Sequence, residues 1–232
     1  MSLPLQDIIE WDVLNWSQLV PAWTPIIDSL DRNSKILAIG ERNGGLSTWL
    51  ALEGFNVICT DRTGPEPHAA ALHRKHGVAH KIQYDKLDIV DCNWQPCQFD
   101  LIIAKSVIGG LKADPANRST RTFQVQQQAV NNIHNLLKPG GYFLSAENME
   151  GSLLLKQIRR IKNKDKGWRH FSWREMPALF KPFAEVKTKA FGVLPTLFSS
   201  PVVNRVVFGM NKYFLQILPS ATKYISFTIA RK

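Results

Sequence analysis

The sequence has few cysteines and no long apolar run, and each shortage excludes a class of protein. Three Cys among 232 residues are too few, and odd in number, for a disulfide-stapled scaffold, and they indicate a reducing compartment. No apolar run reaches the ~18 residues of a membrane span. The opening MSLPLQDIIEWD lacks the basic and apolar regions of a secretory signal. We therefore expect a soluble, cytoplasmic protein.

Acidic residues are scarce in the last third of the chain. Residues 1–150 hold 13 Lys and Arg against 16 Asp and Glu, a net charge of −3. Residues 151–232 hold 16 against 3, a net charge of +13, which accounts for the overall +10. Such a local excess indicates an anionic partner for this region, such as nucleic acid, a nucleotide-linked sugar or a membrane face. A solvated basic surface that only aids solubility is the alternative.

Short apolar runs alternate with stretches of helical spacing in the first two thirds of the chain. This alternation predicts an α/β fold of the doubly wound kind, with a buried and mostly parallel sheet. The strands are expected at 35–40, 56–61, 80–88, 99–104 and 141–146, and the helices at 45–53, 67–76 and 119–137. No linker divides the chain, so we expect one domain over 1–232. Its parts are a helical cover at 1–33, a core at 34–150 and a basic, substrate-side region at 151–232.

Both ends of the chain add elements to this core. Residues 5–30 read as a Trp-rich helical cover that Pro21 and Pro25 interrupt. Past residue 150 we expect a helix at 152–162, a strand at 184–191, a helix at about 203–218 and a last strand at 223–230. The connection 192–222 is too long for a plain hairpin and indicates a lid or docking element. Apolar residues share one face of 203–217, which favours a helix packed on the core; a membrane-surface helix is the alternative.

Three consecutive strand ends carry side chains that suit a nucleoside. The first strand ends in Gly40-Glu41-Arg42-Asn43-Gly44-Gly45, where glycines permit a tight turn before a helix N-terminus. Asp61 ends the second strand, 21 residues past Gly40, and can accept hydrogen bonds from a ribose diol. Asp88 follows the third run, and Ile89 after it could pack on a purine. This order predicts a nucleoside-binding crevice.

The motifs ILAIGERNGG, NVICTD, KLDIVD, FDLIIAKSVIGGL and LLKPGGYFLSAEN carry a more specific resemblance. In this order, over about residues 35–147, the sequence resembles the class I S-adenosylmethionine-dependent methyltransferases. The resemblance implies S-adenosylmethionine as cofactor and a Rossmann-like, seven-stranded sheet whose last strand is antiparallel. The long connection at 192–222 is then a C-terminal insertion between the last two strands. The cofactor contacts that the resemblance implies are Gly40, Glu41, Arg42, Gly44, Asp61, Arg62, Asp88, Ile89 and Lys105.

Two positions depart from the family pattern. Arg42 fills the central glycine position of the first motif, and Ala38 stands where an acid is usual. Glu41 or an N-terminal Trp could replace the lost contacts, since a sulfonium can lie over an aromatic face. The departures leave a non-catalytic scaffold with a relic pocket as an alternative. The pieces WDVLNWS, KSVIGGL and AENMEGS also resemble a bacterial subgroup linked to polysaccharide or small-metabolite synthesis.

Candidate catalytic residues lie just past the fourth and fifth strands. Glu147 is the first choice for a base or an acceptor-orienting group, His170 in a Trp-rich loop is the second, and Lys105 is the third. Ser106 and Asn148 line the same crevice. For Lys105 a strand-end salt bridge, and for His170 an exposed loop position, are the structural alternatives.

The residues around the fourth strand exclude several nucleic-acid and metal chemistries. The position after this strand reads AKSV, without the Asn/Asp-Pro-Pro-aromatic motif of amino methyltransferases. Cytosine-C5 methyltransferases need a Cys nucleophile in that region, often as Pro-Cys, whereas Pro96-Cys97 here lies before the strand. Cys92 and Cys97 have no second pair, so no metal site is expected. RNA methylation stays open, because 156–174 holds 8 Lys and Arg with interleaved aromatics.

Together these patterns predict a methyltransferase that acts on a small-molecule, glycan or lipid-linked acceptor, with methylation at oxygen. An RNA methyltransferase and a non-catalytic scaffold are the alternatives. The expected location is the cytoplasm, with the periphery of the inner membrane face as a variant of it.

Overall fold

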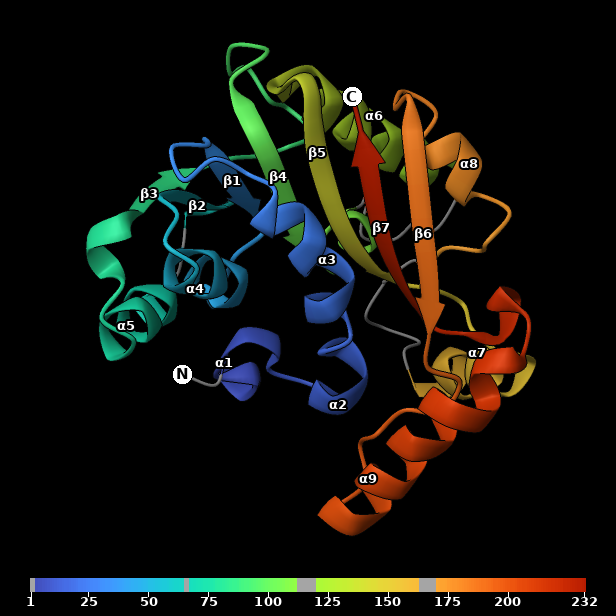
Figure 1. The fold of residues 1–232 in the computed structure, drawn as a ribbon. Coiled ribbons are helices and arrows are strands. Elements are labelled where there is room, and N and C mark those ends of the chain that lie inside the picture. The colour runs from blue at the N-terminus through green and yellow to red at the C-terminus, as the bar shows by residue number, and fades with distance from the viewer. Residues whose placement is uncertain (1–2, 65–66, 112–119, 163–169) are drawn as a thin grey trace.

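The computed structural model describes residues 3–64, 67–111, 120–162 and 170–232 (Figure 1). Its centre is a seven-stranded sheet in the order β3-β2-β1-β4-β5-β7-β6. β7 is antiparallel to both of its neighbours, and the other pairings are parallel. This confirms the predicted doubly wound sheet with an antiparallel last strand. The strands are β1 (Ile36–Ile39), β2 (Val57–Asp61), β3 (Ile82–Lys86), β4 (Phe99–Lys105), β5 (Leu137–Asn148), β6 (Glu185–Phe191) and β7 (Ile225–Arg231).

Helices cover both faces of the sheet, which is why its central strands are continuously apolar. One face packs against the N-terminal helices and α4, with Trp16, Trp23 and Trp49 in the core. The other face packs against α6 and α8, with Phe143 and Phe180 at its centre. The helices are α1 (Leu5–Ile9), α2 (Val13–Trp16), α3 (Leu19–Asp28), α4 (Gly45–Leu52), α5 (Pro67–Lys75), α6 (Thr120–Leu136), α7 (Leu153–Lys162), α8 (Met176–Leu179) and α9 (Pro201–Gly209).

The N-terminal cover is broken at different places from those predicted. α3 runs through both Pro21 and Pro25, whereas the breaks lie at Glu10–Asp12 and Ser17–Gln18. Pro21 lies in the first turn, where its missing N–H has no intrahelical partner to lose. Pro25 removes one hydrogen bond, and the buried Trp23 and Ile27 keep the helix packed on the core.

The C-terminal apolar helix is also placed differently. α9 begins at Pro201 and continues through a π-helical turn (Met210–Phe214) and a 3-10 turn (Leu215–Ile217). The expectation that its apolar face packs on the core is wrong. Val207 is the buried member of that face, while Ile217 is 88% exposed, and the segment projects from the body of the protein (Figure 1).

Candidate functional site

The carboxyl ends of β1, β2, β4, β5 and β6 meet at one edge of the sheet. β6 ends there because it and β5 are both antiparallel to β7. α1, α2, α7 and α9 lie beyond this edge (Figure 1). Ligands of open α/β sheets bind outside the carboxyl ends of the strands, so this edge is where a site is expected.

The turn after β1 needs glycine at two positions. Gly40 has φ +67° and Gly44 has φ +76°, a region that favours glycine. A Cβ on Gly40 would lie 2.5 Å from Cγ2 of Val107, and one on Gly44 would lie 2.7 Å from Nε2 of His73. The turn is therefore held tightly between the loop after β4 and α5, with its backbone at the edge.

Glu41 holds this turn to the helix that follows. Its Oε2 accepts hydrogen bonds from the backbone N–H of Ser47 (3.0 Å) and from the Ser47 hydroxyl (2.9 Å). Burial is the largest influence on the Glu41 carboxyl and raises its pKa, against the two hydrogen bonds from Ser47. Glu41 thus closes the first turn of α4 from inside, whereas its neighbour Arg42 is exposed.

The two predicted acids lie at neighbouring strand ends. Asp61 ends β2 and is half-buried, and its backbone carbonyl accepts from the N–H of Leu87, just past β3. Asp88 is half-buried as well, and its Oδ1 accepts from the N–H of Val90 (3.0 Å). Ile89, which follows Asp88, is 3% exposed and belongs to the core.

Backbone pairing brings these groups to the glycine turn. Thr60, which precedes Asp61, pairs with Ile39, which precedes Gly40. The backbone N–H of Glu41 also donates to the carbonyl of Thr60 (2.9 Å). Arg62 is exposed at the same edge. The predicted turn and acids are therefore assembled side by side.

Lys105 ends β4 beneath the N-terminal cover. Its ammonium donates to the carbonyl of Ile9 (3.0 Å), lies 3.7 Å from Oε2 of Glu10 and sits 3.5 Å from the centroid of the Trp11 ring. Burial lowers its pKa to about 8, although Glu10 and Glu41 act to raise it. The cover thus places a carboxylate and an aromatic ring around this cation. No pattern in the chain indicated Glu10 in this role; the Trp-rich composition was the signal for Trp11.

Glu147 organises the loop after β4. It is 1% exposed, and its carboxylate accepts from the backbone N–H groups of Val107 (3.1 Å), Ile108 (2.9 Å) and Gly109 (3.1 Å). Burial raises its pKa to about 7, while these three hydrogen bonds act to lower it. In this arrangement both carboxylate oxygens are taken up by the loop.

The two other predicted crevice residues bond to each other. Nδ2 of Asn148 donates to Oγ of Ser106 (2.8 Å), and the Ser106 N–H donates to the carbonyl of Ala146 (2.7 Å). Ser106 has φ +55°, so the chain turns sharply at the end of β4. The ends of β4 and β5 are tied together at this point.

A cavity of about 310 Å³ adjoins the end of β5. It is lined by Glu150, Ser172, Trp173, Arg174 and Ala221. The segment with His170 reaches it, because the Phe171 N–H donates to the carbonyl of Asn148 (3.3 Å) and the Glu150 N–H donates to the carbonyl of Phe171 (2.8 Å). These hydrogen bonds hold the segment with His170 against the end of β5, next to the cavity.

A buried polar network near the edge could not be found from the sequence. Asp12 accepts from the Thr196 N–H (2.9 Å) and from the Tyr224 hydroxyl, and Nδ2 of Asn15 donates to Oη of Tyr224 (2.7 Å). Burial, the largest influence, raises the pKa of Asp12. Thr196 and Tyr224 lie about 180 to 210 positions from Asp12 in the sequence, so no local pattern could indicate the pairing. The sequence singled out only the short piece WDVLNWS, which contains Asp12 and Asn15.

The structure also shows where the two departures from the family pattern, Ala38 and Arg42, lie. Ala38 is fully buried within β1 and its carbonyl accepts from Oγ1 of Thr60 (2.9 Å), so its side chain cannot reach a ligand. Arg42 is exposed at the turn.

Among the described residues no group of three or more His, Cys, Asp or Glu could hold a metal ion. In the same part of the chain no helix is both long and apolar enough to cross a membrane.

Comparisons with known proteins agree with this geometry. Residues 37–145 match a family model described as a methyltransferase domain. Over 114 residues the chain is 26% identical to EEF1A lysine methyltransferase 4 of Mus musculus. This match covers 48% of this chain and 44% of that protein.

Solved structures show the same fold. Phosphoethanolamine N-methyltransferase 2 of Haemonchus contortus, in complex with phosphomonomethylethanolamine and S-adenosylhomocysteine, has a TM-score of 0.63 at 19% identity, covering 94% of this chain and 52% of that one. The cyclase SpnF has a TM-score of 0.60 at 15% identity, covering 94% and 82%. The chain thus spans about half the length of the mouse and Haemonchus relatives.

The matched segment begins in β1 and ends in β5, so it contains the glycine turn and both acids. The whole sheet, with the antiparallel β7 next to β5, lies in a chain of which 94% is covered by each of the two structures above. On these grounds residues 37–145 are similar to a methyltransferase domain, and the chain shares the fold of methyltransferases of known structure.

Proposed function

We propose that this protein transfers the methyl group of S-adenosylmethionine to a small-molecule, glycan or lipid-linked acceptor, at an oxygen atom. The observation that carries the proposal is the assembly of the Gly40 turn, Asp61 and Asp88 at one edge of the sheet; a cavity lies past the end of β5 at the same edge. That cavity, about 310 Å³, is of the size that small ligands occupy.

The cofactor fits the donor set at this edge. Asp61 and Asp88 offer half-buried carboxylates, which can accept hydrogen bonds from the ribose hydroxyls and the adenine amino group. Gly40 and Gly44 keep the turn of residues 40–44 compact, and neither carries a side chain that would stand between its backbone and the methionine end. Lys105 supplies a cation near the turn for the cofactor's carboxylate. When bound, S-adenosylmethionine supplies an electrophilic methyl group.

The protein's own residues then have the task of orienting the acceptor, because an in-line displacement depends mostly on attack geometry. We assign Glu147 a positioning role: it holds the loop at Val107–Gly109 in place, and its oxygens are occupied. His170, beside the cavity, is the candidate base that takes the proton from an acceptor hydroxyl.

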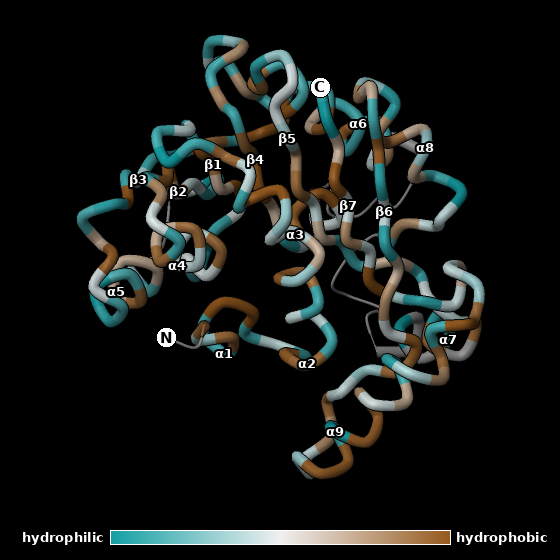
Figure 2. The backbone as a smooth tube through the Cα atoms, in the orientation of Figure 1, coloured by the Kyte–Doolittle hydropathy of each residue, from teal (hydrophilic) through white to brown (hydrophobic). Residues whose placement is uncertain are grey.

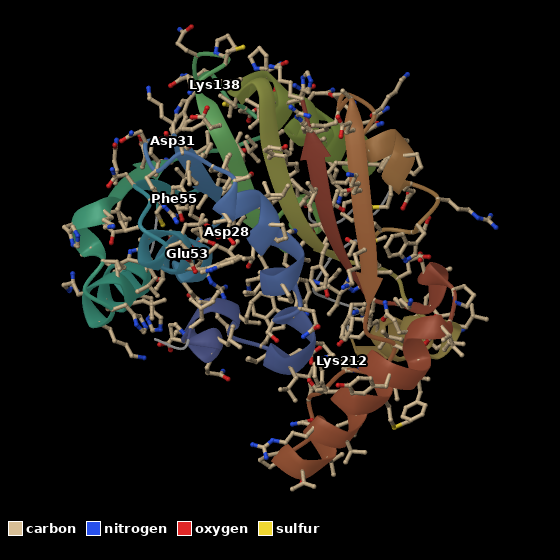
Figure 3. The ribbon with its side chains drawn as sticks, in the orientation of Figure 1. Asp28, Asp31, Glu53, Phe55, Lys138 and Lys212 are labelled. Atoms are coloured by element: carbon tan, nitrogen blue, oxygen red, sulfur yellow. The ribbon has the colours of Figure 1, made fainter. Side chains whose placement is uncertain are left out.

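Calorimetric titration with S-adenosylmethionine and S-adenosylhomocysteine tests the cofactor site. We expect micromolar binding that weakens at least about tenfold in Asp61→Ala, because hydrogen bonds to a charged acceptor are lost. The matched control is Asp28→Ala, an exposed aspartate at the end of α3 (Figure 3). If the folded protein does not bind, or if Asp61→Ala binds as well as the control, the proposal fails and the scaffold alternative holds.

The acceptor is identified by transfer of labelled methyl groups to separate fractions of small metabolites, lipid-linked glycans and RNA. The 8 basic residues of 156–174 favour RNA as the second candidate; residues 163–169 of that stretch lie outside the described residues. Label in RNA that is lost at high salt would support this candidate, because phosphate contacts weaken steeply with salt. The lysine and phosphoethanolamine methyltransferases among the relatives make amine acceptors a necessary comparison.

A further inference from the structure

The connection between β6 and β7 presents an unusually apolar surface to solvent. We call its exposed large apolar side chains the apolar projection. Its most exposed members are Ile217 (88% exposed), Phe214 (71%) and Tyr213 (70%). Figure 2 shows the apolar colour along α9, at the end farthest from the sheet. The full set is Leu194, Leu197, Phe198, Val202, Val203, Val206, Met210, Tyr213, Phe214, Ile217 and Leu218.

The polarity of this segment is reversed relative to an ordinary surface helix. Its anchor to the body is a polar side chain, Asn211, which is 1% exposed. Oδ1 of Asn211 accepts from the N–H groups of Val193 (3.0 Å) and Leu194 (3.1 Å), and its Nδ2 donates to Oδ1 of Asn15 (3.1 Å). These hydrogen bonds, together with the packing of Val207 and Phe208 on the body, fix the segment and leave its other apolar residues outside. Contiguous exposed apolar surface of this kind marks an interaction site.

The charges around the projection indicate what covers it. No Asp or Glu follows Glu185 in the sequence, whereas seven Lys and Arg do. Two of them, Arg205 and Lys212, are exposed on the segment itself, and Figure 3 labels Lys212 there. A basic, apolar surface without acids complements an anionic lipid surface, where apolar side chains enter the acyl boundary and cations meet phosphate. A second copy of the chain would bring the same positive charge and repel it.

The projection also lies on the correct side of the molecule. It follows β6, whose carboxyl end is at the edge that carries the Gly40 turn and the cavity. α9 extends beyond that edge (Figure 1). A bilayer contacted by Phe214 and Ile217 would thus face the same end of the sheet as the cofactor and acceptor sites.

We propose that the apolar projection docks the protein peripherally on an anionic lipid bilayer. This surface does not depend on the proposed methyl transfer, but it agrees with a lipid-linked acceptor. Docking orients the carboxyl edge of the sheet towards the membrane and gives the C-terminal basic region its partner.

Flotation with lipid vesicles tests the proposal on the whole chain. Vesicles contain either phosphatidylcholine alone or a mixture with about one third phosphatidylglycerol. We expect the protein to float with the anionic vesicles and to be released when salt rises from about 0.1 M to about 1 M. The variant Phe214→Ser/Ile217→Ser should bind at least about thirtyfold more weakly, because two apolar side chains no longer enter the lipid. Arg205→Glu/Lys212→Glu should lose at least about tenfold in affinity for anionic vesicles only.

Matched controls separate the surface from a general effect. Leu52→Ser/Val186→Ser replaces two exposed apolar residues away from the projection, and Arg74→Glu/Lys181→Glu reverses two exposed charges elsewhere. Both controls should float as the native chain does. Calorimetry with S-adenosylhomocysteine on each variant keeps a failure of the cofactor site distinguishable from a failure of docking.

Three results would overturn the proposal. One is the absence of flotation, and another is flotation that does not depend on Phe214 and Ile217. The third is a dimer in sedimentation that dissociates in Phe214→Ser/Ile217→Ser while the native chain ignores vesicles, which would assign the projection to a second copy.

Discussion

The buried carboxyl of Glu147 should give the protein a pH-dependent stability that one substitution removes. Burial raises its pKa from an ordinary value of 4.5 to about 7. Between these values the folded state holds a proton that the unfolded chain has already lost. The contribution of Glu147 to stability is therefore highest below pH 4.5, falls as the pH rises towards 7 and is constant above it.

The size of the effect follows from the two pKa values. One pKa unit corresponds to about 1.4 kcal/mol. The rise from 4.5 to about 7 thus corresponds to about 3 kcal/mol of unfolding free energy lost across this window. The group is fully buried, so solvent screening does not reduce this value much.

Urea denaturation of the native chain and of Glu147→Gln, at several pH values from 4 to 8, measures it. The difference in unfolding free energy, native minus variant, should fall by about 3 kcal/mol between pH 4.5 and 7. Asp12, whose pKa burial also raises, titrates in both proteins and cancels. Glu185→Gln, at an exposed carboxylate, is the matched control.

A difference that stays flat, or that grows with pH, would refute this reasoning for Glu147. It would mean that the three N–H donors from Val107, Ile108 and Gly109 outweigh burial and keep the carboxylate charged.

Three further perturbations test other parts of the structure. Gly40→Ala should lower the free energy of unfolding by about 2 kcal/mol and weaken cofactor binding, because its Cβ would meet Val107. Gly77→Ala, at φ +69° with open space around it, should lower the free energy of unfolding less. Urea titration measures the stability, and calorimetry measures the binding. Lys105→Met should abolish a gain in stability that the native chain shows as pH rises from about 8 to 10.5, because the folded state releases that proton first. Asn211→Ala should lower the free energy of unfolding by about 1 to 2 kcal/mol and speed amide exchange at 193–218, because it removes a buried side chain that pairs two partly buried N–H groups.

Much of the fold could be predicted because its signals are local. A continuous apolar run predicts a strand covered on both faces, as β1 is, and a chain that alternates such runs with helices can form few topologies. The Gly40 turn and Asp61 follow strand ends directly. Parallel pairing of β1 with β2 then brings them together without any further condition.

The sequence by itself thus determined the order of the strands and helices along the chain, and which residues lie at the edge where a site is expected. The tertiary structure decided which way side chains turn. Glu147 lies at the carboxyl end of a strand just as Asp61 does, yet the loop after β4 folds over it and takes up its oxygens. The apolar pattern at 203–217 favoured a core helix but is also compatible with a surface helix. Contacts of Asn211 with Val193 and with Asn15, 196 positions away, expose it, and such long-range partners leave no periodic signal in the chain.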